Sequence, residues 1–386
     1  MSTSELRVTA YTWDHKGLGH INRTLGVLQG LKEAEGSLEA LILAEQESPL
    51  LRAAEWPYVC VPLFGGCFKG AREKARSASS HSAVKAAMAY AQATTAVESF
   101  RPNLILQDTV LWSPLFDAAV SHSIPQILVV RHRKDLWQFL QGIQAELEQV
   151  AAIILPHNTE DIEEAEFPAS LRHKLHFSGP ILRPVDDRSE THQALRQKYG
   201  IEPGKRTVVI TAGGGGFEIN QHFFQMVTEA LAEATTYPTH VVIVTGPFYE
   251  GTISLPEATH LTWSLTSFEA HLPALLAIAD LAVSQVGDNS ANEIATLQTP
   301  TLLVPAPREF DDQERRARQM LAPHIRIATM DKARLREALR LMVLERPAYN
   351  AVLSREHAFA SLGRSRSADI ILSALKRPQT QLVPAR

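Results

Sequence analysis

A histidine follows the first predicted strand, at a position where parallel α/β proteins carry out chemistry. The segment Gly17-Leu18-Gly19-His20 brings His20 to the start of a predicted helix, behind the predicted strand 6–12. A helix N-terminus lowers the pKa of a histidine and keeps the imidazole neutral, so that it can accept a proton. His20 is therefore a candidate general base. The alternative is that it caps the helix or binds a backbone carbonyl.

An aspartate ends another predicted strand of the same half of the chain. Asp108 follows the hydrophobic strand 103–107. Because parallel strands end at one edge of a sheet, we expect Asp108 to lie at the same edge as His20. There it can hold the imidazole in one tautomer and stabilise the imidazolium that proton transfer forms. The alternative is that Asp108 caps the following helix.

Four consecutive glycines, Gly213, Gly214, Gly215 and Gly216, follow the predicted strand 207–211. A backbone without side chains can approach a ligand closely, and bare N–H groups before a helix can bind phosphate. The segment predicts a site for a diphosphate or for the transferred group. The alternative is a flexible turn.

Two later strand ends carry donors and acceptors for a sugar nucleotide. After the predicted strand 281–284, Gly287 turns the chain, Asn289 and Ser290 offer donors at a helix start, and Glu293 follows one turn later. This pattern is typical of a pyrophosphate held at a helix N-terminus, with Glu293 accepting bonds from ribose hydroxyls. After the strand 301–304, the residues Asp311, Asp312 and Gln313 can grip sugar hydroxyls. Taken singly, each pattern is a capped helix, with Ser290 or Asn289 at one start and Asp311 at the other.

The elements that position these residues alternate between apolar strands and helical patterns, which predicts two doubly wound α/β domains of Rossmann type that face a cleft. The expected divisions are a domain over 1–180, a linker over 181–188 with two prolines nearby, a domain over 189–345, C-terminal helices over 346–376 and a tail over 377–386. Predicted helices in the second domain include 268–278 and 312–321. A chain of 386 residues is long enough for two such cores.

Composition excludes several classes of protein. Lys and Arg number 38 against 42 Asp and Glu, a net charge of −4, so no overall positive field collects nucleic acid. The two cysteines, Cys60 and Cys67, fit neither a redox pair nor a zinc site. No apolar run has the length of a membrane span and the N-terminus is polar, from which we expect a cytoplasmic protein.

Several motifs are incomplete or missing. Asn22 replaces the third glycine of a dinucleotide fingerprint, and no obvious acidic ribose ligand ends the second strand, 38–44, so a nicotinamide cofactor is disfavoured. No D-x-D and no H-E-x-x-H triplet occurs, so neither a bound metal nor any other cofactor is expected.

A basic segment follows the predicted strand 126–130. Arg131 and Arg133 can neutralise an anionic acceptor, or they belong to a solvated loop. The apolar residues after them, from Leu136 to Leu140, can touch a membrane surface, although packing on the protein's own sheet explains them as well.

These residues together resemble the GT-B glycosyltransferases, in particular the MurG-like enzymes and a group of predicted bacterial glycosyltransferases, over most of the chain. In the first loop the resemblance rests on the pattern G-x-G-H-x-x-R, matched by Gly17, Gly19, His20 and Arg23. In the donor loop it rests on Gly287, Asn289, Ser290 and Glu293, followed by the pair Asp312 and Gln313. Gln285 and Val286 stand where the family usually has His and Gly, and Asp108 stands where many members keep the partner of the catalytic histidine.

The resemblance implies an inverting, metal-independent glycosyltransferase that moves a sugar from a nucleotide-diphosphate sugar, UDP-linked in this family, to an acceptor hydroxyl. In this interpretation His20 is the base, Gly19, Arg23, Arg131 and Arg133 face the acceptor, and the glycine and donor loops bind the donor. A nucleotide-sugar hydrolase that uses water keeps the same fold and is the closest alternative. A nucleotide-sugar epimerase and a non-catalytic sugar-binding protein are further alternatives.

Overall fold

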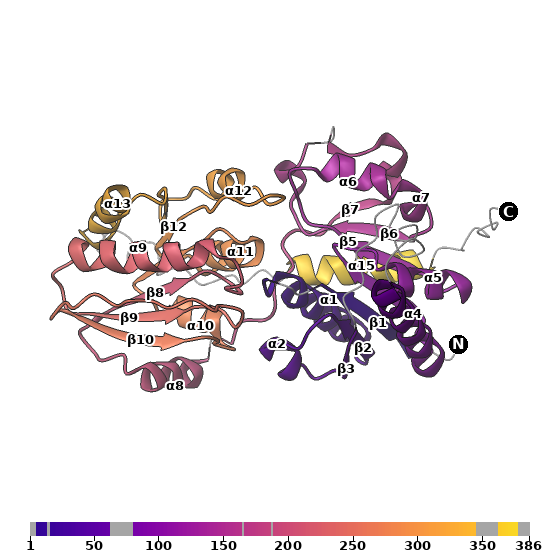
Figure 1. The fold of residues 1–386 in the computed structure, drawn as a ribbon, viewed down its shortest axis with the longest axis horizontal. Helices are drawn as coiled ribbons and strands as arrows, with labels where there is room; N and C mark the ends of the chain where they lie inside the picture. Colours follow the sequence, from indigo (N-terminus) through magenta and orange to yellow (C-terminus); the bar gives the residue numbers. More distant parts are fainter. Residues whose placement is uncertain are drawn as a thin grey trace. The chain divides into compact units, whose positions relative to one another are not determined.

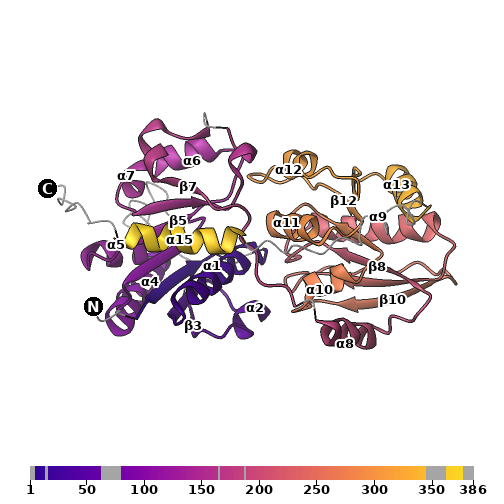
Figure 2. The same cartoon turned by 180° about the vertical axis from the view of Figure 1, so that it is seen from behind.

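The computed structural model describes residues 5–13, 16–61, 80–163, 166–186, 188–344 and 362–376. The chain divides into two compact units (Figures 1 and 2). The first unit comprises Met1–His15, His20–Arg183 and Ser361–Arg386, and the second comprises Lys16–Gly19 and Pro184–Ala360. Cys67, the predicted helical segment between 346 and 361, and the tail 377–386 lie outside the described residues.

The first unit is built on a parallel sheet of seven strands in the order β3-β2-β1-β4-β5-β6-β7. Its strands are β1 (Arg7–Thr12), β2 (Glu39–Ala44), β3 (Tyr58–Cys60), β4 (Leu104–Asp108), β5 (Gln126–Val129), β6 (Ala152–Leu155) and β7 (Leu175–Phe177). Most of these are short apolar runs, buried as expected for strands covered on both faces.

The helices of the first unit connect and cover these strands. They are α1 (Gly19–Glu35), α2 (Pro49–Arg52), α4 (Ser80–Phe100), α5 (Ser113–Ser121), α6 (Leu136–Gly142), α7 (Gln144–Leu147) and α15 (Leu362–Lys376), with short 3-10 turns at Thr159–Asp161 and Ala169–Lys174. Helices α4 to α7 form one apolar core with alternate residues of the strands, such as Ile105 and Ile153.

The second unit repeats this design with a parallel sheet of six strands in the order β10-β9-β8-β11-β12-β13. Its elements are α8 (Ser189–Tyr199), β8 (Arg206–Thr211), α9 (Ile219–Ala234), β9 (Thr239–Val244), β10 (Leu261–Thr266), α10 (Leu272–Ala277), β11 (Leu281–Ser284), α11 (Asp288–Leu297), β12 (Thr301–Leu303), α12 (Gln313–Gln319), β13 (Ile325–Ile327) and α13 (Lys332–Leu344). Val208 packs with α9 and α13, and the next residue, Val209, packs with α8, α10 and α11. The unit therefore has three layers, with helices on both faces of the sheet.

Each sheet has one point where the strand order reverses direction, which is where doubly wound proteins bind ligands. In the first sheet it lies between β1 and β4, and in the second between β8 and β11. The predicted site residues that follow these four strands therefore lie at the two switch points. The fold class of two doubly wound α/β domains is confirmed.

Helix α15 returns from the end of the chain to the first unit, as both views show (Figures 1 and 2). Arg364 packs against Gly30 of α1 and donates a hydrogen bond from Nε to Glu33 at 3.0 Å. A Cβ atom on Gly30 would lie 2.6 Å from the Arg364 carbonyl oxygen, and one on Gly363 would lie 2.0 Å from the Pro180 oxygen. Glycine at these two positions is what allows the backbones to approach.

Differences from the sequence analysis concentrate at sheet edges. Strands β7, β10 and β13 were not predicted, and each lies at the edge of its sheet or is only partly buried. An edge strand needs no continuous apolar run, so it has a weaker pattern than a central one. Helix α8 was also missed, because polar residues dominate it.

One helix was predicted to begin too early. The predicted helix 268–278 begins at Leu272, because Glu269 turns the chain by accepting a bond from the His271 backbone N–H at 2.9 Å and Pro273 occupies the first helical turn.

Across the described residues, no helix combines the length and the apolar character that a membrane span needs.

The contact between α1 and α15 predicts the effect of a small substitution. Gly30→Ala forces a methyl group against the Arg364 backbone, so we expect the protein to lose about 1–3 kcal/mol of stability in urea unfolding followed by circular dichroism. Gly142→Ala is the matched control, because its Cβ meets no atom within 4 Å. It should be neutral or slightly stabilising. Equal stability of the two variants would contradict the close packing of α15.

Candidate functional site

His20 and Asp108 meet at the switch point of the first sheet. The His20 Nδ1 atom lies 2.6 Å from Asp108 Oδ1. An ionised carboxylate only accepts hydrogen bonds, so Nδ1 must carry the proton and Nε2 is left as the proton-accepting atom. The predicted pairing of these two side chains is present in the structure. Asp108 does not cap helix α5, whose first flanking residue is Trp112.

Arg23 holds the other side of Asp108. Its Nε donates to Asp108 Oδ2 and its Nη2 to Oδ1, both at 2.7 Å. Both side chains are 1% exposed. The sequence motif predicts an acceptor contact for Arg23, whereas in the structure its guanidinium is buried against Asp108. We therefore assign Arg23 to positioning Asp108.

The charges of this cluster set its protonation. Burial alone raises the pKa of Asp108, but the Arg23 charge and the hydrogen bonds from His20 and Arg23 outweigh it and lower the pKa to about 2. Burial lowers the pKa of His20, and the charges of Arg23 and Arg131 add to this effect against the opposing effect of Asp108. The site therefore contains a neutral imidazole on an ionised carboxylate at neutral pH.

Thr109 completes the cluster and was not singled out in the sequence. Its hydroxyl accepts from Arg23 at 3.2 Å and donates to Asp108 Oδ1 at 3.0 Å. Its backbone has a φ of +61°, an uncommon conformation for a β-branched residue. Such strain is found where the surroundings over-determine the backbone, often at functional sites. A threonine directly after the strand-ending Asp108 was the available signal.

Glu45, an acidic residue at the end of the second strand, was not singled out in the sequence. It directly follows β2, and its carboxylate accepts from the Tyr11 hydroxyl at 3.2 Å. Burial raises its pKa to about 7, against the effect of hydrogen bonds from Tyr11 and Trp13. The Trp13 ring in turn lies 5.9 Å from the His20 ring. Glu45 is thus a further titratable group near the same edge.

The basic segment after β5 is folded onto its own unit. Arg133 pairs with Asp135 and stacks on the Phe139 ring, with 4.4 Å from the guanidinium carbon to the ring centre. Arg131 donates to the His132 backbone oxygen at 3.1 Å. These contacts favour the structural interpretation of Arg133 over the predicted acceptor contact.

Most of the apolar residues predicted to touch a membrane beside this segment are buried in the first unit. Leu136, Phe139 and Leu140 belong to the apolar core, and Trp137 alone of these four residues is substantially exposed. This packing favours the alternative that the helix covers its own sheet.

The glycine loop of the second unit is tightly packed. Gly215 has a φ of +86°, and a Cβ atom on it would lie 2.4 Å from the Thr245 carbonyl oxygen. The neighbouring loop is tied on by a hydrogen bond from the Phe248 N–H to the Gly214 oxygen at 3.0 Å. The loop that holds Gly213, Gly214, Gly215 and Gly216 is therefore a fixed surface rather than a flexible turn.

Helix α11 begins beside this loop. Its flanking residue is Gly287, with Asn289 and Ser290 in the first turn rather than as caps. A Cβ atom on Gly213 would lie 3.9 Å from Ser290 Oγ, so the two predicted donor-binding segments adjoin. Glu293, one turn later, is 8% exposed. Gly19, at the start of α1 in the sequence, has open space where its Cβ would be.

Arg316 neutralises the acidic residues around α11. Its Nη2 donates to Asp311 Oδ1 at 2.7 Å, its Nε lies 3.4 Å from Asp288 Oδ1, and its Nη1 donates to the Val286 oxygen at 2.6 Å. The negative charge of Asp288 is thereby offset within the unit.

The pair Asp312 and Gln313 has a different place from the one predicted. The Asp312 carboxylate caps helix α12 by accepting from the Arg315 N–H at 3.0 Å, a role the sequence analysis gave to Asp311. The Gln313 Oε1 atom accepts from the backbone N–H groups of Val286 and Ala306 at 3.2 and 2.9 Å. The Gln313 oxygen thus joins the two loops, while the Asp312 oxygen belongs to the start of α12. The contact of this pair with sugar hydroxyls stays a prediction.

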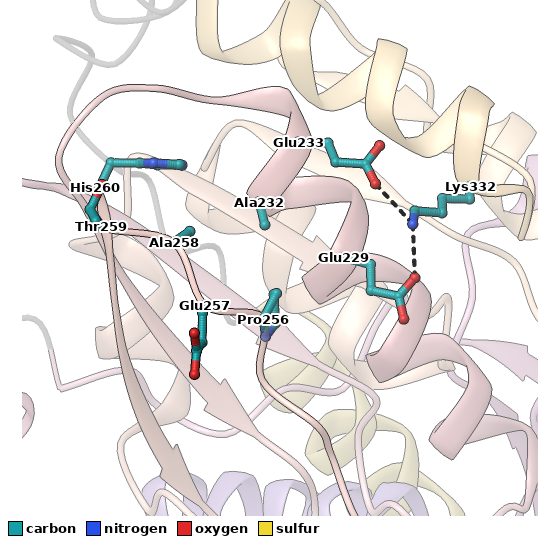
Figure 3. Close-up of a pocket in the computed structure, with 9 residues that line it drawn as sticks. All are labelled: Glu229, Ala232, Glu233, Pro256, Glu257, Ala258, Thr259, His260 and Lys332. Atoms are coloured by element: carbon teal, nitrogen blue, oxygen red, sulfur yellow. Dashed lines mark ion pairs between the residues drawn. The ribbon is translucent and has the colours of Figure 1, made fainter.

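A cavity of about 550 Å³ lies elsewhere in the second unit, between the end of α9, the segment before β10 and the start of α13 (Figure 3). Lys332 lies 2.9 Å from Glu229 and from Glu233 at its wall. None of the predicted site residues lines this cavity. Within the part of the chain that the structure describes, no group of three or more His, Cys, Asp or Glu side chains is arranged to hold a metal ion.

The paired carboxylate of Asp108 predicts a pH-dependent stability. A pKa lowered from 3.8 to about 2 contributes stability that is present above pH 4 and is lost as the pH falls towards 2. We expect Asp108→Asn to cost about 2 kcal/mol at pH 7, and this difference from wild type should shrink below pH 4 in urea unfolding at a series of pH values. A difference that does not change with pH would show that the charge of Asp108 does not stabilise the fold.

A model of the glycosyltransferase family 28 C-terminal domain matches residues 207–364. A UDP-N-acetylglucosamine–N-acetylmuramyl-(pentapeptide) pyrophosphoryl-undecaprenol N-acetylglucosamine transferase of Phocaeicola vulgatus is 29% identical over 34% of this chain and 36% of its own length. The transferase of the same name from Halalkalibacterium halodurans is 23% identical over 75% of this chain and 76% of its own.

A solved structure extends the likeness to the whole fold. The kitacinnamycin glycotransferase superposes with a TM-score of 0.64 and 15% identity, over 96% of this chain and 100% of its own. The chain spans about a third of the length of the first curated relatives it matches. The resemblance to GT-B glycosyltransferases is confirmed at the level of the fold and of the second domain. The chain has the GT-B fold of the glycosyltransferases, and its residues 207–364 match the model of the glycosyltransferase family 28 C-terminal domain.

Proposed function

We propose that this protein is an inverting glycosyltransferase that moves a sugar from a nucleotide-diphosphate sugar to an acceptor hydroxyl. The observation that carries the proposal is the 2.6 Å contact of His20 Nδ1 with an ionised, buried Asp108, in a chain that also has a family 28 domain. That contact makes Nε2 the proton acceptor and stabilises the imidazolium that forms.

The proposed reaction is a single displacement. The acceptor oxygen attacks the anomeric carbon and the bond from that carbon to the diphosphate oxygen breaks. The acceptor proton passes to His20 Nε2, and the configuration at the anomeric carbon inverts. Arg23 acts on the reaction through Asp108, because it keeps this carboxylate ionised and in place. Asp108 in turn keeps the proton of the resting imidazole on Nδ1.

The proposed donor is UDP-linked, which is the nucleotide in the names of the relatives reported above. In the second unit the glycine loop and the first turn of α11, with Ser290, supply donors for the departing diphosphate, and Glu293 accepts from the ribose. The cytoplasmic compartment expected from the sequence is part of the same proposal.

Removing the base tests the chemistry directly. His20→Ala should lower turnover by about 10²- to 10⁴-fold, the usual contribution of a general base, while the affinity for UDP measured by calorimetry stays within about twofold. The matched control is His122→Ala, another histidine of the first unit, whose Nδ1 atom lies 2.9 Å from the Ala118 oxygen at the end of helix α5. Loss of UDP affinity in His20→Ala with unchanged turnover at saturation would reverse the assignment.

The pH profile of the same enzyme gives an independent reading. Because burial and the nearby guanidinium groups lower the pKa of His20, activity should fall on the acid side only below pH 6.5.

Incubation with the nucleotide sugar in water alone separates a transferase from a hydrolase. A transferase should hydrolyse the nucleotide sugar only slowly when no acceptor is present. Many rapid turnovers without an acceptor, abolished by His20→Ala, would show that the enzyme is a hydrolase.

Metal independence is a separate expectation of the proposal. The departing diphosphate is assigned to backbone N–H groups and the helix dipole of α11, so activity should survive millimolar EDTA without loss. The measurement is initial rate with and without chelator, followed by addition of magnesium or manganese. A loss on chelation that either ion restores would require a metal in the donor site.

A further inference from the structure

Three side chains from three neighbouring strand ends of the second sheet form a cluster that the assigned roles do not use. Asn220 begins α9 behind β8, Gln285 follows β11, and Arg308 follows β12. These strands are adjacent in the sheet, so the cluster lies at its carboxyl edge. Arg308 Nη2 donates to Gln285 Oε1 at 2.7 Å and to Asn220 Oδ1 at 3.4 Å.

The chemistry of these groups fixes which way the two amides face. A guanidinium has only donors, so each amide must present its oxygen to Arg308 and turn its NH₂ group elsewhere. Asn220 is 0% exposed and Gln285 is 3% exposed. Neither the Asn220 Nδ2 nor the Gln285 Nε2 atom has a hydrogen-bond partner among the residues that the structure describes. Two buried donors are left without an acceptor, which is costly unless a ligand supplies one.

The guanidinium itself is partly shielded from water. The Phe217 ring lies over it, with 3.7 Å from the guanidinium carbon to the ring centre. Burial lowers the pKa of Arg308 to about 10, and the charge of Asp311 opposes this effect. Arg308 therefore remains a cation at neutral pH in a partly desolvated place, where an anion binds more strongly than it does in water.

Arg308 also lies on the loop that was expected to grip the transferred sugar. In that loop Asp312 caps α12 and Gln313 holds the backbone of Val286 and Ala306. Arg308 is the side chain of this loop that joins the cluster at the sheet edge. It is a cation, and the amides of Gln285 and Asn220 lie beside it. Such a set suits negatively charged oxygens better than neutral hydroxyls.

We propose that Arg308, Gln285 and Asn220 form an oxyanion-binding site for the donor substrate. The inference rests on the proposed function, since it places this site beside the donor-binding glycine loop and α11. The oxyanion has two possible sources, the diphosphate of the donor or a carboxylate on the transferred sugar. Both present paired acceptor oxygens to the guanidinium and the amide NH₂ groups.

The test uses the full chain and four probes in calorimetric titrations: inorganic pyrophosphate, UDP, UDP-glucose and UDP-glucuronate. Arg308→Met should weaken binding of the relevant probe by about 10- to 100-fold, the value of charge-assisted hydrogen bonds. The matched control is Arg318→Met, which removes the same charge from the exposed face of the adjacent helix, where Arg318 is 74% exposed. It should leave all four affinities unchanged.

The pattern across the probes identifies the oxyanion. If pyrophosphate and UDP weaken as much as the sugar nucleotides, the cluster binds the diphosphate. If UDP-glucuronate alone weakens, the cluster binds a sugar carboxylate. Unchanged affinity of Arg308→Met for all four probes would overturn the proposal.

A double variant separates ligand binding from a structural role. Arg308→Met combined with Gln285→Met removes the guanidinium together with its closest amide partner. The fold loses the hydrogen bond between these two side chains, and it also loses the Gln285 NH₂ group, which has no acceptor among the described residues. We expect thermal stability without ligand to be equal or higher, and binding of the affected probe to be lost. Lower stability with retained binding would make the cluster a structural network and would also overturn the proposal.

Failure of this inference and failure of the proposed function give different results. Arg308-dependent binding of pyrophosphate or UDP without any sugar transfer or hydrolysis would support the oxyanion site and contradict the proposed enzymatic function. Sugar transfer that depends on His20 but not on Arg308 would support the proposed function and contradict the oxyanion site.

Discussion

The buried ion pair between Asp108 and Arg23 is the interaction on which the first unit's site depends. A carboxylate that is 1% exposed is stable only when its charge is compensated. Arg23 compensates it with two parallel hydrogen bonds, which tie the end of β4 to the first turns of α1. The same pairing keeps Asp108 ionised, and its Oδ1 atom then orients His20. One ion pair therefore fixes both the geometry and the protonation of the candidate base.

In the second unit a different arginine compensates the charges of poorly exposed carboxylates. Arg316 compensates Asp288 and Asp311 and binds the Val286 oxygen, while Gln313 binds the backbone of the same loop. These contacts satisfy the polar groups that would otherwise disturb the start of α11. Against this background the NH₂ groups of Asn220 and Gln285 stand out, because their surroundings supply no acceptor among the described residues. Two buried amides that share one guanidinium and lack an acceptor for their NH₂ groups indicate where a ligand belongs.

Much of the fold follows from local sequence patterns. The central strands are apolar runs with clear boundaries, and the residues just after them were expected at the carboxyl edge of each sheet, where the structure places them. His20 and Asp108 were paired on the expectation that parallel strands end at one edge. Edge strands such as β10 and the polar helix α8 were missed, because a half-exposed element needs no apolar pattern. Glu45 was overlooked at the end of β2, although it carried the same signal as Asp108.

What the sequence by itself determined is the fold class, the order of the elements and which residues lie at strand ends, since periodicity and turn residues are local properties. Only the tertiary structure decided what those residues do there. Arg23 matches a motif position in the sequence, but burial beside Asp108 makes it a positioning residue. Gln313 and Asp312 likewise match a motif and turn inward to backbone partners. The cluster around Arg308 joins residues 88 positions apart, Asn220 and Arg308, and no local pattern contains that pairing. Hydrogen-bond partners and burial depend on groups that are distant in the chain, so they appear only once the sheet has brought its strand ends together.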